Sequence, residues 1–269
     1  ANTGFVHAHT SAQTPPEIIP VDILLLAYRS GIFPMADSRD DPEVFWVEPR
    51  RRAIIPLDRF HCSRSLAKLI RQERFRVSCN EAFGAVIDAC AAPRPGHPES
   101  WISDRIAASY LALHRAGYAH SIECWDGNDL VGGLYGVGFD RAFCGESMFS
   151  RVRDASKVAL AWLVASMRRS HSTLLDCQFM TGHLASMGAE EIPQEEYLNL
   201  LSEAQARSLQ ARPDQAPSSS RTAGSAGGAA DALASGAGVP LGFAALLEDA
   251  ASAFSSPGKL IAQSFTQAS

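Results

Sequence analysis

The chain has 269 residues, of which 46% are hydrophobic and 20% charged, and its formal net charge is -5 at pH 7. This composition is typical of a soluble globular protein with one large or two modest domains, and the negative charge argues against attraction of the whole molecule to nucleic acid. No apolar run approaches the roughly 20 residues of a membrane span, and the N-terminal sequence lacks the basic-then-apolar order of a secretory signal. We therefore expect a cytoplasmic protein without a membrane anchor.

Several common kinds of functional site are absent from the sequence. The six cysteines form no CxxC pair and most adjoin apolar residues, so we expect buried thiols rather than disulfides or zinc ligands. There is no Walker-type loop, no GxGxxG motif after a strand, no Ser/His/Asp elbow and no HExxH motif. We predict neither a metal site nor a cofactor.

The first part of the chain predicts a small N-terminal domain over residues 1–60. The run VDILLLAYR is typical of a short helix that ends at Gly31, and Phe33, Pro34 and Met35 follow it as a turn. Two short strand-like runs, FWVEP and RRAIIPL, complete this unit.

A strongly basic segment comes next. Residues 50–76 contain nine basic side chains against two acids. From Ser63 the pattern is helical, with Leu66, Leu69 and Ile70 on one face and Arg64, Lys68 and Arg71 on the other. Such a face is usually plain solvated surface, but so many cations with little compensation also suit phosphates.

The segment from 61 to 203 predicts an α+β domain. It begins with the basic helix, the strand FRVSC, a helix around AFGAVIDACA and a second helix from about residue 103 to 116. The runs HSIECW, DLVGGLYGVGF and RAFCGESMF are joined by hairpin signals and predict an antiparallel meander. The apolar helix DASKVALAWLVASMRR, the strand LLDCQFM and a short helix with a return follow.

The C-terminal part has a different composition. Ala, Gly, Ser and Pro dominate much of residues 204–240, which predicts a disordered linker that cannot bury enough apolar area to fold. Residues 241–269 regain Leu, Phe and Ile and predict a weak helix in a tail to which the sequence assigns no role.

Two polar side chains stand out on the predicted strand LLDCQFM. At period two, Asp176, Gln178 and Met180 point one way and Leu175 and Cys177 the other. Alternation of this kind is common on a surface strand. The preceding helix is apolar almost all round, however, so the strand is expected to be central, with Asp176 and Gln178 facing a cavity.

Glu146 is a lone carboxylate in the apolar strand FCGESMF, where alternation groups it with Cys144 and Met148, opposite Phe143 and Phe149. It is either part of a site or a buried ion pair with Arg151 or Lys157, and spacing alone does not separate the two. The glycines of GGLYGVG indicate a bulge or a close approach in the same sheet. Trp101, in a polar loop, is either core packing or a stacking platform.

These stretches carry a resemblance to a known family. In order along residues 24–201, AYRSGIFPM, NEAFGAVIDACA, LVGGLYGV, FCGESMFSR, LLDCQF and HLASMGAEEIP resemble the leucyl/phenylalanyl-tRNA-protein transferases. The resemblance implies a GNAT-like acyltransferase domain with a mixed, largely antiparallel sheet after the small N-terminal domain. It also implies transfer of Leu or Phe from aminoacyl-tRNA to proteins with N-terminal Lys or Arg, which creates an N-degron.

The resemblance also implies roles for individual residues. Glu146, Asp176 and Gln178 would handle the amines and the ester, and Met35 and Trp101 would flank the terminal adenosine. The aminoacyl side chain would lie among six apolar residues: Leu134, Phe143, Met148, Leu163, Met167 and Leu175. The tRNA phosphates would be held by four cations: Arg64, Lys68, Arg71 and Arg74.

The sequence departs from the family pattern at two places. Thr181 and Gly182 replace a pair that often contains Asn, and Leu134 stands where Met is common. Two alternative functions stay open: an acyl-CoA-dependent N-acetyltransferase, which the absence of a Q/RxxGxG/A loop before a helix disfavours, and a non-catalytic tRNA-binding protein.

Overall fold

A computed structural model of the chain describes residues 17–93, 99–210 and 236–266. Its N-terminal unit contains helix α1 (Val21–Arg29) and the antiparallel hairpin of β1 (Phe33–Met35) and β2 (Phe45–Val47). Helix α1 ends next to Gly31, whose φ of 79° is the left-handed conformation that glycine adopts easily. The predicted short helix is confirmed, but Phe33, Pro34 and Met35 form strand β1 instead of the expected turn.

The main sheet has seven strands in the order β4-β5-β6-β7-β8-β3-β9. Neighbours are antiparallel except for the parallel pair β7 and β8. The predicted meander is therefore confirmed as β5, β6 and β7. The strands are β3 (Arg51–Ile54), β4 (Arg76–Cys79), β5 (Ala119–Asp126), β6 (Asp129–Phe139), β7 (Ala142–Ser150), β8 (Leu174–Gln178) and β9 (Glu190–Pro193).

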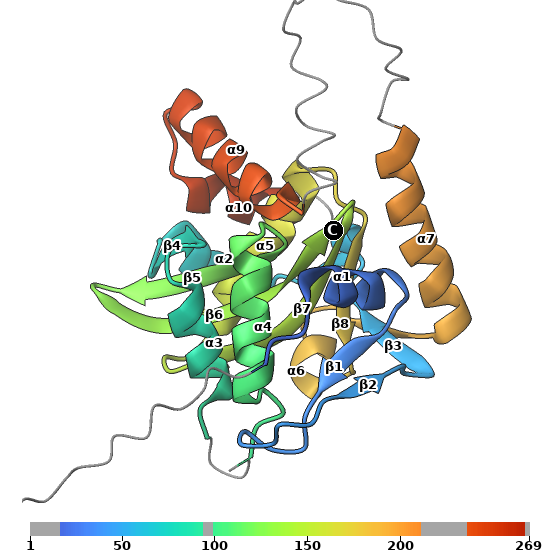
Figure 1. The fold of residues 1–269 in the computed structure, drawn as a ribbon. Coiled ribbons are helices and arrows are strands. Elements are labelled where there is room, and N and C mark those ends of the chain that lie inside the picture. The colour runs from blue at the N-terminus through green and yellow to red at the C-terminus, as the bar shows by residue number, and fades with distance from the viewer. Residues whose placement is uncertain (1–16, 94–98, 211–235, 267–269) are drawn as a thin grey trace, which may run out of the picture.

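Helices cover both faces of this sheet (Figure 1). Helices α3 (Phe83–Ala91) and α4 (Asp104–Arg115) pack with α1 over one face, and α5 (Ala155–Arg169) crosses the other. The remaining helices are η1 (Leu57–Arg59), α2 (Arg64–Arg71), α6 (Gly182–Ala185), α7 (Gln194–Gln210), α9 (Gly238–Ser252) and α10 (Pro257–Thr266). The chain is thus an α+β protein with a hydrophobic core on each side of a mixed sheet.

Strand β3 lies where the sequence did not place it. We expected RRAIIPL to belong to the N-terminal unit, but β3 pairs with β8 on one side and β9 on the other. The pairing joins residues more than 120 positions apart, so no local pattern could predict it. It buries Arg52 of β3 in the fold, whereas Arg51 stays exposed.

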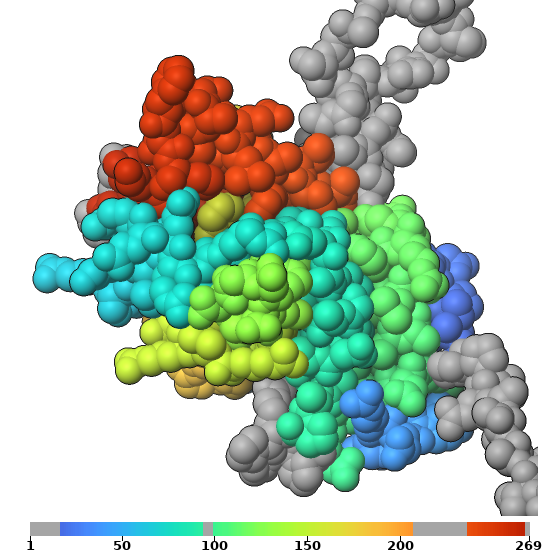
Figure 2. Space-filling model, turned by 90° about the vertical axis from the view of Figure 1, so that its left-hand side faces the viewer, coloured from blue at the N-terminus to red at the C-terminus, as the bar shows by residue number. Residues whose placement is uncertain are grey.

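The C-terminal region is more ordered than predicted wherever the structure describes it. Residues 204–210 belong to α7, and residues 238–240 begin α9. The prediction of a disordered linker was therefore wrong at these two ends. The rest of that linker, residues 211–235, lies outside the described residues. Helix α9 packs on α5, and α10 packs on α2. Figure 2 shows the red C-terminal segment directly over the cyan segment that includes α2.

Two glycines of β6 allow close approaches that a side chain would block. A Cβ on Gly132 would lie 2.5 Å from the Cβ of Ala155 at the start of α5, and one on Gly136 would lie 2.2 Å from the Cys144 carbonyl oxygen. The glycine-rich run therefore serves packing between β6, β7 and α5. In the part of the chain that is described, no helix is long and apolar enough to cross a membrane.

Strands β7 and β8 are paired only at one end. Their register runs from Ala142 opposite Leu174 to Cys144 opposite Asp176, and β7 then continues to Ser150 paired with β6 but not with β8. A bulge leaves Glu146 without a partner on β6, because Tyr135 pairs with Ser147 and Gly136 with Gly145. The two central strands therefore separate just where Glu146 and Gln178 lie, and a gap opens between them.

Candidate active site

A cavity of about 580 Å³ lies between the separated ends of β7 and β8. Eight of the predicted site residues line it: Met35, Trp101, Leu134, Glu146, Met148, Leu163, Leu175 and Gln178. Two predicted pocket residues do not: Phe143 and Met167 are 1% and 0% exposed and lie in the core behind the wall. Segments far apart in the sequence thus build one cavity that combines an apolar wall with a few polar groups.

The bulge also changes which side chains share a face. We expected Met148 to lie with Glu146 and Cys144, opposite Phe143. In the structure Met148 packs with Phe143 in the core on the α5 side, whereas Cys144 belongs to the opposite core. One extra residue in a strand inverts the alternation beyond it, so the prediction was wrong for Met148 and Phe149. Glu146 lies on the Cys144 side, as expected, where it contacts Tyr110.

The apolar wall contains residues that the sequence analysis missed. Leu160, one turn before Leu163 on α5, and Leu184 of α6 both line the cavity. Helix α6 is short, and the Thr181 hydroxyl caps it by accepting a hydrogen bond from the Leu184 N–H at 3.2 Å. The spacing of Leu160 and Leu163 was visible in the sequence, but only the packing of α5 shows that both face the cavity.

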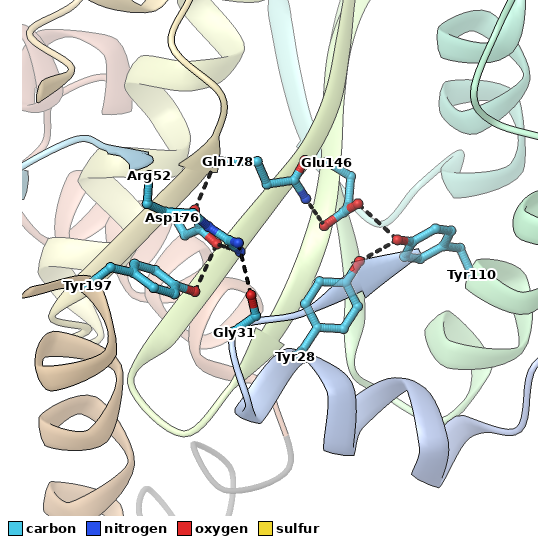
Figure 3. Close-up of polar contacts among 8 residues, drawn as sticks. All are labelled: Tyr28, Gly31, Arg52, Tyr110, Glu146, Asp176, Gln178 and Tyr197. Atoms are coloured by element: carbon cyan, nitrogen blue, oxygen red, sulfur yellow. Dashed lines mark hydrogen bonds and ion pairs between the residues drawn. The ribbon is translucent and has the colours of Figure 1, made fainter. Parts of the chain in front are cut away.

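Glu146 is bound entirely by neutral groups (Figure 3). Tyr110 of α4 donates to its carboxylate at 2.8 Å, and the side-chain amide of Gln178 donates to the other oxygen at 2.7 Å. Tyr28 of α1 in turn hydrogen-bonds Tyr110. The suggested ion pairs are not formed, since Arg151 donates to the Leu130 carbonyl and Lys157 pairs with Asp154.

The surroundings of Glu146 change its acidity. Burial raises its pKa to about 7, against the opposing effect of hydrogen bonds from Tyr28, Tyr110 and Gln178. A carboxylate of this kind changes protonation state near neutral pH, while its side chain still faces the cavity. These properties are typical of a group that exchanges protons with a ligand.

Asp176 is completely buried and does not line the cavity. Arg52 grips its carboxylate with two hydrogen bonds, at 2.9 Å from Nε and 2.6 Å from Nη2. Tyr197 donates to the same carboxylate at 3.1 Å, and the backbone N–H of Gln178 donates at 2.8 Å. The expectation that Asp176 faces a cavity was therefore wrong, because β3 and α7 cover its side of the strand.

Gln178 connects the hydrogen bonds around Asp176 with those around Glu146 (Figure 3). Its backbone N–H binds Asp176, and its side chain binds Glu146. Its φ is 62°, an uncommon value for a residue other than glycine. Such strain persists only where neighbours hold it, and here the Asp176 carboxylate does so. Gln178 therefore reaches the cavity in a fixed orientation.

The basic segment is mostly neutralised in three dimensions. Five of its nine cations form ion pairs: Arg51 with Glu191, Arg52 with Asp176, Arg59 with Glu190, Arg74 with Asp126, and Arg76 with Glu81. Arg52 is 1% exposed and binds Asp176 behind the cavity, whereas the sequence pattern counted it only as positive charge. No sequence signal separated it from its neighbour Arg51.

Helix α2 keeps the basic face that was predicted. The Ser63 hydroxyl caps it by accepting from the Leu66 N–H, and Leu66 and Ile70 are buried. Arg64, Lys68 and Arg71 are exposed, and no salt bridge to them is found within the described ranges. Three cations on one face are thus free to meet an anionic partner.

The site is suited to holding an apolar side chain beside an amine or an ester. Leucines and Met148 supply the apolar wall, and Gln178 and Glu146 supply a hydrogen-bond donor and a proton-accepting oxygen next to it. His183, also on the wall, keeps a buried Nε2 without a hydrogen-bond partner among the described residues. A polar ligand group would satisfy that nitrogen.

Comparison with known proteins gives one consistent result. The family model described as leucyl/phenylalanyl-tRNA protein transferase matches residues 54–202, and the model of that family's N-terminal domain matches residues 18–50. A leucyl/phenylalanyl-tRNA–protein transferase of Novosphingobium aromaticivorans is 60% identical over 273 aligned positions, which cover 96% of this chain and 100% of the relative. A Zymomonas mobilis protein of the same name is 60% identical over 70% of each chain. The chain therefore belongs to the leucyl/phenylalanyl-tRNA protein transferase family, and it is an aminoacyltransferase.

Proposed function

We propose that the protein transfers leucine or phenylalanine from an aminoacyl-tRNA to the N-terminal Lys or Arg of acceptor proteins, and that the product is an N-degron. The observation that carries this proposal is the placement of Glu146 and Gln178 beside an apolar wall in one cavity. The apolar wall suits a Leu or Phe side chain. The two polar groups suit the ester and the incoming amine at its open end.

The donor would lie across this cavity. Its side chain would contact Leu134, Met148, Leu163 and Leu175, together with Leu160 and Leu184. Its terminal adenosine would lie near Met35 and Trp101, which line the cavity from the N-terminal unit and from the loop before α4. Phe143 and Met167 would act from behind the wall by fixing its shape.

The chemistry requires little base strength. The acceptor is an α-amino group with a pKa of roughly 7.7 to 8.0, so part of it is already deprotonated near neutral pH. Much of the rate would come from holding the amine next to the ester carbonyl. Glu146, Gln178 and Asp176 would form one hydrogen-bonded group that handles the amine and the ester.

The tRNA would be held through its phosphates. Arg64, Lys68 and Arg71 present an exposed cationic face, and such contacts supply affinity without reading the base sequence. Arg74 would contribute less, because Asp126 already binds its guanidinium through two hydrogen bonds.

We extend the proposal to the fold family and the compartment. The antiparallel strands β4 to β7, followed by α5 and the parallel strand β8, support a GNAT-like catalytic domain. The cytoplasm is the proposed location because charged tRNA is found there.

The test is transfer of labelled Leu or Phe from charged tRNA to a peptide with N-terminal Arg, with an N-terminal Asp peptide as the matched control. We expect label on the Arg peptide alone. Transfer of acetyl from acetyl-CoA in place of the aminoacyl group would favour the acetyltransferase. Tight tRNA binding with no transfer from either donor would favour a non-catalytic tRNA-binding protein.

A further inference from the structure

We propose that Glu146, rather than Asp176, takes the proton released by the acceptor amine, and that Arg52 is a positioning residue that fixes Asp176 as the anion holding Gln178. This inference rests on the proposed function and assigns a separate role to each of these residues. It also gives a role to a buried arginine that no motif indicated.

The two carboxylates differ in their access to the cavity. Glu146 and Gln178 line the cavity, whereas Asp176 does not and has no exposed surface. Both Asp176 oxygens are already occupied by four donors from Arg52, Tyr197 and the Gln178 backbone. A proton on the acceptor nitrogen can meet the Glu146 carboxylate directly, but it has no path to Asp176 that avoids Gln178.

The two carboxylates also differ in their partners. Asp176 is paired with the Arg52 guanidinium, which donates a hydrogen bond to each of its oxygens. Within the described ranges no salt bridge to Glu146 is found, and five titratable residues interact with it: Tyr28 of α1, Tyr110 of α4, Tyr135 of β6, Cys144 of β7 and Asp176 of β8. Cys177 of β8 and His183 of α6 line the same cavity, and burial lowers the pKa of His183. The tyrosines are neutral near pH 7 because burial raises the pKa of each one. Of the two carboxylates, Glu146 is therefore the one that faces the cavity and has no ion pair among the described residues.

Contacts from three segments hold the Arg52 side chain in place. Its guanidinium lies between the rings of Phe33 and Tyr197, 4.8 Å and 4.4 Å from their centroids, and Nη1 donates to the Gly31 carbonyl at 3.0 Å. Arg52 thus ties the N-terminal unit, β3 and α7 to Asp176. Because Asp176 in turn holds the strained backbone of Gln178, a shift of Arg52 would reach the Gln178 side chain.

The proposed step exchanges an ester bond for an amide bond. The amine nitrogen attacks the ester carbonyl carbon and a C–N bond forms. The bond from that carbon to the ribose oxygen breaks, and the oxygen leaves with its electron pair. Glu146 accepts one N–H proton and returns it to the ribose oxygen, so the products are an amide and a ribose hydroxyl. Tyr110, backed by Tyr28, donates to the carboxylate and steadies it throughout.

The test is the pH dependence of single-turnover transfer at saturating charged tRNA and low acceptor peptide, in Glu146→Gln and Asp176→Asn. Both changes keep the shape of the side chain. Below the pKa values of Glu146 and of the amine, the rate of the parent depends on both deprotonations. Glu146→Gln should lower the rate by about 10²-fold or more and should reduce the slope of log rate against pH by one. Titration of the donor's own amino group affects the rate of all variants in the same way. A change in the slope of log rate against pH therefore reports on the substituted residue.

Asp176→Asn should slow transfer but keep the slope of the parent. Glu123→Gln, an isosteric change at a buried carboxylate of β5 away from the cavity, is the matched control and should also keep it. A reduced slope in Asp176→Asn with an unchanged slope in Glu146→Gln would overturn the inference. A parent that transfers nothing would instead refute the proposed function.

The role of Arg52 is tested by measuring the single-turnover rate and the tRNA affinity of the same variant. Arg52→Met should lower the single-turnover rate by about 10²-fold, the effect of a small misplacement, while tRNA affinity stays unchanged. Arg52→Lys should recover part of the rate. If Arg52→Met does not fold, Arg52→Met combined with Asp176→Asn removes the unpaired buried charge and allows the same measurement. Loss of tRNA affinity with an unchanged rate would make Arg52 a phosphate contact and overturn its assignment.

Discussion

Arg52 and Asp176 are 124 residues apart in the chain, yet their side chains form a two-bond ion pair of 2.9 and 2.6 Å with 1% and 0% of their surfaces exposed. The pair lies where β3 meets β8, and Asp176 is two residues before Gln178, which lines the cavity. The same contact therefore supports the fold and the site. Its neighbour Arg51 pairs with Glu191 on the surface and provides a natural comparison.

Arg52→Met should destabilise the protein by about 3–5 kcal/mol, because it leaves the Asp176 charge buried without its partner. Arg51→Met should cost less than about 1 kcal/mol, since an exposed ion pair contributes little. Denaturant unfolding of both variants measures the difference. Equal losses would show that the Arg52 pair adds nothing beyond a surface contact.

Glu146 should make stability depend on pH. Its pKa is raised to about 7 in the folded protein, so the folded state binds more protons than the unfolded state between the ordinary Glu value and pH 7. The stability of the parent should fall as pH rises through this window, by on the order of 3 kcal/mol from Glu146 alone. Glu146→Gln should remove that part of the fall. Urea unfolding at pH 5 and pH 8 tests this, and an unchanged difference between the two pH values in the variant would contradict it.

Leu134→Phe should reduce Phe transfer more than Leu transfer, by about tenfold or more in the ratio, because Leu134 lines the apolar wall. Competition between the two charged tRNAs in one reaction gives the ratio directly. Met167→Leu, behind the wall, is the control and should affect both donors alike. Equal losses for the two donors in Leu134→Phe would count against a side-chain pocket at this position.

Replacing Arg64, Lys68 and Arg71 together by Ala should weaken binding of any tRNA and flatten its salt dependence. Each lost phosphate contact should reduce the slope of log affinity against log salt by about 0.7 to 0.9. Arg115→Ala, an exposed cation at the end of α4, should leave the slope unchanged, so that Arg71→Ala and Arg115→Ala form a matched pair. An unaltered slope in the triple variant would move the tRNA contact elsewhere.

Gly258→Val should loosen α10 from α2. A Cβ at Gly258 would lie 2.2 Å from the Ile70 carbonyl oxygen, and the Gly258 N–H donates to Glu73 at 3.2 Å. We expect a loss of about 1–3 kcal/mol in unfolding free energy and faster proteolysis of the C-terminal segment. Ala251→Val, on the exposed side of α9, should cost less than about 1 kcal/mol. Equal sensitivity of the two variants to protease would refute the docking role of Gly258.

Local patterns in the sequence were enough to predict the kinds of element and much of their order. The strand-like runs HSIECW and DLVGGLYGVGF, with a hairpin signal between them, indicated paired strands, because turn residues act locally. The spacing of Leu66 and Ile70 indicated a helix with one buried face, because side-chain periodicity is also a local property. The motifs around Glu146 and Gln178 also pointed to the residues that face the cavity.

The surroundings of those residues depend on contacts between distant segments. The bulge at Glu146 inverted the expected face of Met148, and β3 entered the main sheet and turned Arg52 from a surface cation into the partner of Asp176. The tyrosines on Glu146 and the docking of α9 and α10 likewise join distant segments. The free energy of such contacts depends on which segments meet and on how much water they exclude, and neither is written in the local pattern of any one segment.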